Sequence, residues 1–208
     1  MSQPNLFSFA TSELSQDAFI CWFLAWASPE YAKFDEELHQ CAQQFVTSLF
    51  LKHGKSAPRI IKKVDVKRQD NNIDILCIVN DTFPILIEDK TDSENHSDQL
   101  SRYLEIIKSR GYELANIIPI YFKTRDQASY EEVIGNDYQP YLRLDFLKVL
   151  DMYTGENSIL IDYRLYLQTI DDEVESYKST HIDEWEQSAW VGFYLKLQGN
   201  YSPPITHK

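Results

Sequence analysis

Glycine and cysteine are scarce in this chain of 208 residues, and basic side chains are outnumbered by acidic ones. The six glycines are scattered, which excludes a glycine-rich loop that cradles phosphates. The three cysteines (Cys21, Cys41 and Cys77) lie within apolar patterns and have no Cys-x-x-Cys spacing, so reduced, buried thiols in a cytoplasmic protein are expected. No basic segment followed by an apolar core opens the sequence, and no apolar run reaches membrane-spanning length.

The acidic excess is large and uneven. Lysine and arginine number 20 against 32 aspartates and glutamates, a formal charge of −12, which argues against a protein that coats nucleic acid non-specifically. Residues 151–208 carry half of this deficit, whereas residues 59–68 (RIIKKVDVKR) carry five basic side chains and one acidic one. An apolar content of 43% over this length is enough for one domain with a well-formed core.

Residues 72–90 (NIDILCIVNDTFPILIEDK) are the stretch around which the rest of the chain is organised. They read as two apolar strands joined by a turn at Asn80-Asp81. Three charged residues interrupt the apolar pattern: Asp74, Glu88 and Lys90. Charges at one end of an apolar hairpin cost free energy unless they are paired or perform a function.

The alternation of strand side chains arranges these charges. Glu88 and Lys90 point to the same face, about 7 Å apart, while Asp89 points to the other face. If the two strands pair as a hairpin, Asp74 lies opposite the end of the second strand. An exposed strand end with a weak ion pair would also explain Glu88 and Lys90. Two carboxylates, however, are ligands that Mg²⁺ prefers, and a neighbouring lysine can orient or deprotonate the attacking water and stabilise phosphate charge.

Asp74, an interval of fourteen residues and Glu88-Asp89-Lys90 together resemble the motif of the PD-(D/E)xK nuclease superfamily, although Ile73 stands where that motif has proline. Glu13, which precedes the apolar stretch Phe19–Leu24 at the start of the first helix, resembles a further metal-site glutamate of this superfamily. As an alternative, Glu13 is an ordinary acidic residue at a helix N-terminus.

Gln99 and Tyr103 are four residues apart on a predicted helix and follow Lys90 closely. This Gln-x-x-x-Tyr element resembles an additional motif of the RecB-like branch, in which the glutamine supports the site near the metal. The alternative is an amphipathic helix with a solvated Gln99. The resemblance implies that Asp74, Glu88, Lys90 and Gln99 are catalytic and that Glu13, Asp74 and Glu88 bind Mg²⁺ or Mn²⁺.

Periodicity and capping residues predict the remaining elements. Helices are expected over residues 15–26, 34–53, 98–110, 142–153, 159–177 and 183–198, with Ser15 as the N-cap of the first and Gly54 ending the second. Strands are expected over residues 59–68 and 115–123. Residues 91–97 are expected to form a polar loop that contains His96, and residues 199–208 a flexible tail. The strand over residues 115–123 is expected to pack inside the sheet beside the second hairpin strand, although Pro119 is awkward there and suggests an edge position or a bulge. The aromatic side chains of the last helix (Trp185, Trp190, Phe193 and Tyr194) are expected to pack in the core, although such rings can also stack on bases.

Candidate contacts to nucleic acid are basic side chains near the hairpin together with one tyrosine: Lys62, Lys63, Lys67, Tyr103, Lys123 and Arg125. The lysines of residues 59–68 serve equally well to protect an edge strand from pairing with another chain. His96 is the one histidine near the motif, and we leave it out of the metal set because a lone loop histidine is commonly exposed.

These observations predict an α/β protein. The resemblance implies a restriction-endonuclease-like core, with four to five mixed strands flanked by helices, over residues 1–150, and a helical C-terminal extension of the same domain over residues 151–208. It also implies a Mg²⁺-dependent endo- or exonuclease that acts on nucleic acid, DNA before RNA, in prokaryotic defence or DNA processing. The alternatives are an inactive nuclease-fold module that binds nucleic acid or a protein partner, and a structural or regulatory protein. In that last case the C-terminal helices would contact a second copy or a partner.

Overall fold

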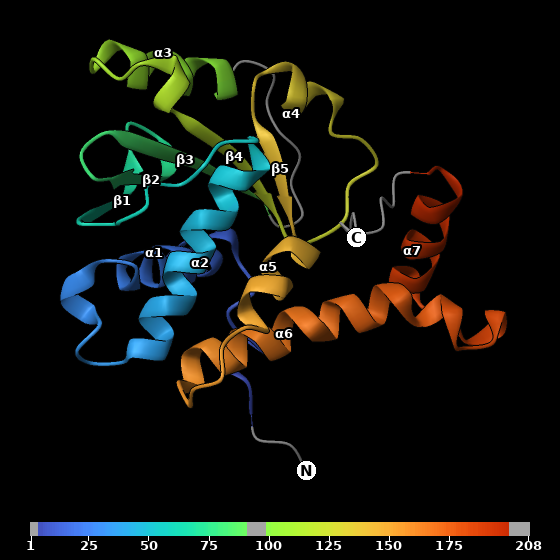
Figure 1. Ribbon diagram of the computed structural model, residues 1–208. Coiled ribbons are helices and arrows are strands. Elements are labelled where there is room, and N and C mark those ends of the chain that lie inside the picture. The colour runs from blue at the N-terminus through green and yellow to red at the C-terminus, as the bar shows by residue number, and fades with distance from the viewer. Residues whose placement is uncertain (1–3, 91–98, 200–208) are drawn as a thin grey trace.

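A mixed sheet forms the centre of the computed structural model, which describes residues 4–90 and 99–199 (Figure 1). Five strands lie in the order β1-β2-β3-β4-β5. Their bounds are β1 (Val64–Asp70), β2 (Ile73–Val79), β3 (Phe83–Lys90), β4 (Ile118–Lys123) and β5 (Gln139–Leu142). The first three strands are antiparallel, and β4 and β5 run parallel to β3. This mixed five-stranded sheet confirms the predicted α/β class.

The hairpin predicted over residues 72–90 is the β2–β3 pair. Asn80, Asp81 and Thr82 connect the strands, and φ angles of 53° and 55° put Asn80 and Asp81 in the left-handed conformation found in tight hairpin turns. The Asn80 side chain also accepts hydrogen bonds from the backbone N–H groups of Lys62 at 2.7 Å and Lys63 at 3.2 Å, which fixes the segment entering β1. Leu76 pairs with Leu86, and this register brings the start of β2 beside the end of β3.

Helices cover both faces of the sheet. The helices are α1 (Glu13–Trp26), α2 (Glu36–Lys52), α3 (Gln99–Ser109), α4 (Glu131–Gly135), α5 (Arg143–Leu150), α6 (Ser158–Glu175) and α7 (Gln187–Leu197), with short 3₁₀ turns η1 (Leu6–Ser8), η2 (Pro29–Tyr31), η3 (Leu114–Asn116), η4 (Ser176–Lys178) and η5 (Ile182–Glu184). Apolar side chains of α1, α2, α5 and α6 pack on one face in the larger core cluster. Those of α3 and α4 pack on the other face. Figure 1 shows α3 on the side of the sheet opposite to α1.

Most predicted elements form within a few residues of their expected bounds. The first helix begins at Glu13, two residues before the predicted N-cap Ser15, because Ser12 takes the extended cap conformation. Asp35 caps α2 by accepting the Leu38 N–H at 2.9 Å, and Gly54 follows that helix at a φ of 63°. The short elements β5 and α4 are absent from the predictions. The expected loop at residues 91–97, with His96, and the tail from residue 200 lie outside the described residues.

Pro119 lies in β4, which packs inside the sheet beside β3 as predicted, so the edge position that this proline suggested is wrong. It pairs with Leu86 of β3, while the ladder from β4 to β5 begins one residue later, at Ile120 and Gln139. Pro119 therefore sits where β4 is paired on one side, so its missing N–H breaks no ladder there. Its carbonyl oxygen accepts a hydrogen bond from His53 Nε2 at 2.6 Å.

The C-terminal helices divide into a packed part and a peripheral part. Leu160, Tyr163, Leu167 and Ile170 of α6 belong to the larger core cluster, and the division at residue 150 stays a prediction. The aromatic side chains around α7 instead pack on one another, with Trp185 and Trp190 ring centroids 4.8 Å apart, and Tyr194 is 54% exposed. The expected core packing of these rings is therefore wrong, because α7 packs on α6 and η4 rather than on the sheet.

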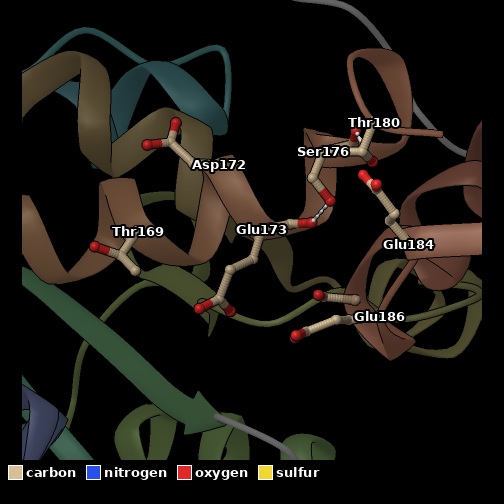
Figure 2. A pocket seen from close by; sticks show the side chains of 8 residues that line it. Thr169, Asp172, Glu173, Ser176, Thr180, Glu184 and Glu186 are labelled. Carbon is tan, nitrogen blue, oxygen red and sulfur yellow. Dashed lines mark hydrogen bonds between the residues drawn. The ribbon is translucent and has the colours of Figure 1, made fainter.

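A hollow of about 400 Å³ lies between α6 and the segment that leads into α7 (Figure 2). Hydroxyl and carboxylate groups line it, from Thr169, Asp172, Glu173, Ser176, Thr180, Glu184, Glu186 and Ser188. None of the predicted catalytic residues is among them. Its four carboxylates disfavour a phosphate ligand, so this hollow is not a candidate for nucleic-acid binding.

Gly192→Ala is expected to destabilise the packing of α7 on α6. A Cβ at Gly192 would meet the backbone oxygen of Val174 at 2.1 Å, and a backbone atom cannot move aside as a flexible side chain can. We expect a loss of about 1–3 kcal/mol, measured by urea unfolding followed through tryptophan fluorescence. Gly135→Ala, whose Cβ meets nothing within 4 Å, is the matched control and should be neutral or stabilising. A Gly192→Ala variant as stable as the wild type would contradict this close packing.

Candidate active site

The structure brings Asp74, Glu88 and Lys90 together at the end of the β2–β3 hairpin. Glu88 is buried, and its Oε1 lies 2.7 Å from Lys90 Nζ. The carboxyl group of Asp74 is close enough to that of Glu88 to share a hydrogen bond. Asp74 Oδ2 also accepts the backbone N–H of Asp89 at 3.1 Å, which ties β2 to the end of β3. Asp74 and Glu88 therefore share one face of the sheet, as the hairpin pattern predicts.

Gln99 and Tyr103 of α3 complete this side of the cluster. Gln99 Nε2 donates to Glu88 Oε1 at 2.8 Å and also lies 2.8 Å from the Tyr103 hydroxyl oxygen. The four-residue spacing on α3 places both side chains against β3. Gln99 is therefore not a solvated residue of an amphipathic helix, because it holds one oxygen of Glu88. Tyr103 is buried in turn, and its hydroxyl oxygen accepts this bond from Gln99.

Burial and the neighbouring charge of Asp74 raise the pKa of Glu88 to about 8. Glu88 Oε2 is buried and has no hydrogen-bond donor among the described residues. Burial acts to lower the pKa of Lys90, but the hydrogen bond to Glu88 and the charge of that carboxylate outweigh it and raise the pKa. Burial and Asp74 thus favour a protonated Glu88, whereas the ion pair with Lys90 favours its carboxylate form.

Asp89 points to the opposite face, toward α1, and is buried there. Its Oδ1 accepts a hydrogen bond from Gln16 Nε2 at 2.5 Å. Its carboxyl group is within hydrogen-bond reach of Asp17, and burial raises the pKa of both groups, that of Asp17 to about 6. Asp17 is also close enough to Asp74 for that charge to raise its pKa. Glu88 thus pairs with Asp74 on one face of the sheet, and Asp89 pairs with Asp17 on the other face. Asp74 is close enough to influence both pairs.

Glu13 and Gln69 border the cluster. Glu13, the first residue of α1, lies close enough to Lys90 and Asp17 to raise the pKa of each. Gln69 has a φ of 56°, a left-handed conformation that is uncommon for this residue type, and its Nε2 donates to Asp74 Oδ1 at 3.1 Å. The unusual backbone at the end of β1 therefore directs an exposed amide toward the Asp74 carboxylate.

The carboxyl groups of Asp74 and Glu88 supply some, but not all, of the oxygen ligands that a hard divalent cation needs. Among residues 4–90 and 99–199, no three His, Cys, Asp or Glu side chains are arranged as a ready-made metal site. Two adjacent carboxyl groups, one with an unsatisfied buried oxygen, are nonetheless what Mg²⁺ needs when water and substrate phosphate supply the other ligands. The residues therefore fit a site that is completed by substrate.

The predicted nucleic-acid contacts fall into two groups. Lys62, Lys63, Lys67 and Arg125 are exposed, whereas Lys123 and Tyr103 are buried. The two buried residues do not lie on an exposed binding surface, which corrects the prediction for them. Lys123 was expected to be accessible because it ends its strand, but β4 is central and the register places Lys123 beside Lys90. Tyr103 faces the core because Gln99 and the sheet lie against it.

The exposed lysines lie at different distances along β1 from Asp74. Lys67 pairs with Leu76, so it shares the sheet face of Asp74 and lies close to the cluster. Lys62 and Lys63 enter β1 near the Asn80-Asp81 turn, at the other end of the hairpin. The intervening strand spans about 20 Å. Lys63 also pairs with Asp81 at 2.7 Å.

A family model described as the PD-(D/E)XK nuclease superfamily matches residues 4–191 of the chain. The chain belongs to the PD-(D/E)XK nuclease superfamily. The match confirms the family resemblance that the Asp74 and Glu88-Asp89-Lys90 motif suggested, and it extends through α6 into α7. No curated protein and no solved structure matches the chain significantly. A nuclease-type function is thus supported by membership of the superfamily and by the residues that the fold brings together.

Sequence reasoning missed three polar residues around this nuclease-type cluster: Gln16, Asp17 as a partner of Asp89, and Gln69. Gln16 and Asp17 follow Glu13 by three and four residues, so all three share a helix face, and that spacing in an apolar helix was the available signal. Gln69 had no comparable signal, because its role depends on a left-handed backbone conformation.

Proposed function

We propose that this chain is a Mg²⁺- or Mn²⁺-dependent nuclease that hydrolyses phosphodiester bonds in nucleic acid, DNA before RNA. The observation that carries the proposal is the adjacency of the Asp74 and Glu88 carboxyl groups, with Lys90 Nζ 2.7 Å from Glu88. A buried acid beside a half-buried acid and an ammonium group at one strand end would be costly as a purely structural feature. Membership of the superfamily supports the same reaction class.

Asp74 and Glu88 would hold the metal, and Glu13 would add a negative charge nearby. A divalent ion bound there would polarise the phosphate and lower the pKa of a coordinated water. Gln99 would keep Glu88 in place through its 2.8 Å hydrogen bond. Since the pKa of Glu88 is raised to about 8, its proton must leave before the carboxylate binds a cation.

Lys90 would act on the water or on the phosphate rather than on the metal, because an ammonium group cannot be a ligand. Its raised pKa keeps it charged, so it would donate a hydrogen bond and offset the charge that builds up on the phosphate. The water oxygen bonds to phosphorus, the ester oxygen leaves, and the proton lost by the water passes to solvent or a neighbouring base.

The nucleic acid would approach from the side of β1 that carries Lys67. Its exposed ammonium group lies on the face of Asp74, and Arg125 follows β4 on the surface. None of the described helices is long and apolar enough to cross a membrane. Three free cysteines, two of them buried, are consistent with the proposed cytoplasmic location. The half-exposed aromatic cluster around α7 is the candidate contact with a second copy or a protein partner. A role in prokaryotic defence or DNA processing belongs to the same proposal.

The proposal is tested by single-turnover cleavage of single- and double-stranded DNA and RNA with Mg²⁺, Mn²⁺ or EDTA. We expect cleavage with either metal and none with EDTA, and heat of Mn²⁺ binding that Asp74→Ala removes, because Asp74 is half of the carboxyl pair. Binding to a labelled oligonucleotide should weaken with salt. A wild-type protein that binds nucleic acid but cuts no substrate with either metal would favour an inactive module instead.

A further inference from the structure

The reaction outlined above gives no role to the buried acid Asp89, the middle residue of the Glu88-Asp89-Lys90 element. Its side chain points away from the cluster, yet it is only 1% exposed. Its backbone N–H, in contrast, donates to Asp74 Oδ2 at 3.1 Å. Asp89 therefore connects the Asp74 carboxylate on one face of the sheet to helix α1 on the other face.

Both ends of the Gln16 side-chain amide are hydrogen-bonded, and one of them holds the Asp89 side chain. Its Nε2 donates to Asp89 Oδ1 at 2.5 Å, and its Oε1 accepts from the Thr124 hydroxyl at 2.8 Å and the Tyr163 hydroxyl at 3.2 Å. All four side chains are buried. Because both ends of the amide are engaged, its orientation is fixed and cannot reverse without losing these bonds.

The network reaches the C-terminal helices through two further contacts. Tyr163 belongs to α6, and its ring stacks on Phe19 of α1 with centroids 3.7 Å apart. Arg143 Nη1 donates to the Thr124 carbonyl oxygen at 2.7 Å, and its Nε donates to Asp171 Oδ1 of α6 at 3.0 Å. Helix α6 is therefore connected by hydrogen bonds to Gln16 and through it to Asp89.

We propose that Gln16 is a positioning residue. It anchors Asp89 so that the Asp89 N–H orients the Asp74 carboxylate, and Tyr163 of α6 holds Gln16 in that orientation. The inference rests on the proposed nuclease function for its consequence, but the positioning itself is a property of the metal-free chain. A buried outer partner of this kind, when removed, typically costs about 10–100-fold in metal affinity or activity.

Four variants test the network. Gln16→Leu removes both ends of the amide at similar volume, and we expect it to weaken Mn²⁺ binding by about 10–100-fold. Tyr163→Phe keeps the ring stacked on Phe19 and removes only the hydroxyl, with an expected loss of about fivefold, the equivalent of one hydrogen bond. Asp89→Leu should resemble Gln16→Leu. Asp89→Asn should keep affinity close to that of the wild type, because its amide oxygen still accepts from Gln16 and its NH₂ can donate to Asp17.

Two measurements are made on each variant without nucleic acid: Mn²⁺ binding by calorimetry, and hydrogen exchange at the Asp89 amide in the metal-free protein. The Asp89 amide should exchange faster in Gln16→Leu and Tyr163→Phe than in the wild type, because Asp74 no longer holds it. Ser48→Ala is the control, since it removes a hydrogen bond to the buried Tyr141 hydroxyl at 2.7 Å that does not involve Asp89. It should leave both readouts unchanged.

The positioning role is wrong if folded Gln16→Leu and Tyr163→Phe variants bind Mn²⁺ and protect the Asp89 amide as the wild type does. It is equally wrong if Ser48→Ala produces the same losses, because general destabilisation would then explain them. Failure of the proposed function gives a different result, in which the wild type binds no metal and cuts nothing. The amide exchange rates then still decide whether Gln16 orients Asp89.

Discussion

Lys90→Ala is expected to slow phosphodiester cleavage by on the order of a hundredfold or more, because it removes the ammonium group that would act on the water or the phosphate in the proposed reaction. Its effect on metal binding should depend on pH. Lys90 lies 2.7 Å from Glu88 and lowers the pKa of that carboxyl, which burial and Asp74 raise to about 8. Without the lysine the pKa of Glu88 rises further, so Mn²⁺ binding should weaken at pH 7 and recover near pH 9.

Single-turnover rates and calorimetric titrations at pH 7 and pH 9 measure the two effects separately. Lys90→Arg keeps a charge beside Glu88, so it should restore metal affinity at pH 7 without restoring the full rate, because the planar guanidinium places its donors differently. Lys108→Ala, which removes an exposed lysine paired with Glu105 on α3, is the control and should change neither quantity. If Lys90→Ala cuts every substrate as fast as the wild type, the lysine is structural.

Glu88→Gln is expected to abolish both metal binding and cleavage at every pH, whereas metal binding by the wild type should depend on pH. In the wild type the raised pKa means that Glu88 carries a proton at neutral pH, and a cation must displace it. Apparent Mn²⁺ affinity should therefore rise by up to about tenfold per pH unit and level off above pH 8. Titrations at pH 6, 7, 8 and 9 provide the measurement.

The raised pKa of Glu88 also makes the stability of the metal-free protein depend on pH. A carboxyl group whose folded pKa is raised from 4.5 to about 8 binds its proton more tightly in the folded state, so its contribution to stability is lost as pH rises through that window. The free energy of unfolding should fall from pH 5 to pH 8 in the wild type and fall less in Glu88→Gln. Glu105→Gln, at an exposed position on α3, is the control. A wild-type metal affinity that stays constant from pH 6 to pH 9 would contradict a raised pKa of Glu88.

Local patterns in the sequence were enough to find the hairpin and its charged end. Asn80-Asp81 between two apolar runs specifies a tight turn, and strand alternation then assigns Glu88 and Lys90 to one face and Asp89 to the other. The four-residue spacing of Gln99 and Tyr103 likewise places both on one face of α3. These features depend on dihedral angles and periods that a short segment sets by itself, which is why they could be predicted.

Long-range packing decided what these patterns leave open. Pro119 suits an edge strand and Lys123 an accessible strand end, yet β4 pairs with both β3 and β5 and Lys123 is buried, because a strand's position in a sheet depends on its partners. The aromatic side chains around α7 read as core but lie on the periphery for the same reason. Gln16 and Tyr163 are 147 residues apart, and only the docking of α6 on α1 brings them together behind Asp89. The sequence by itself determined which residues are the candidates for the chemistry, whereas the tertiary structure decided which of them are buried and what holds them in place.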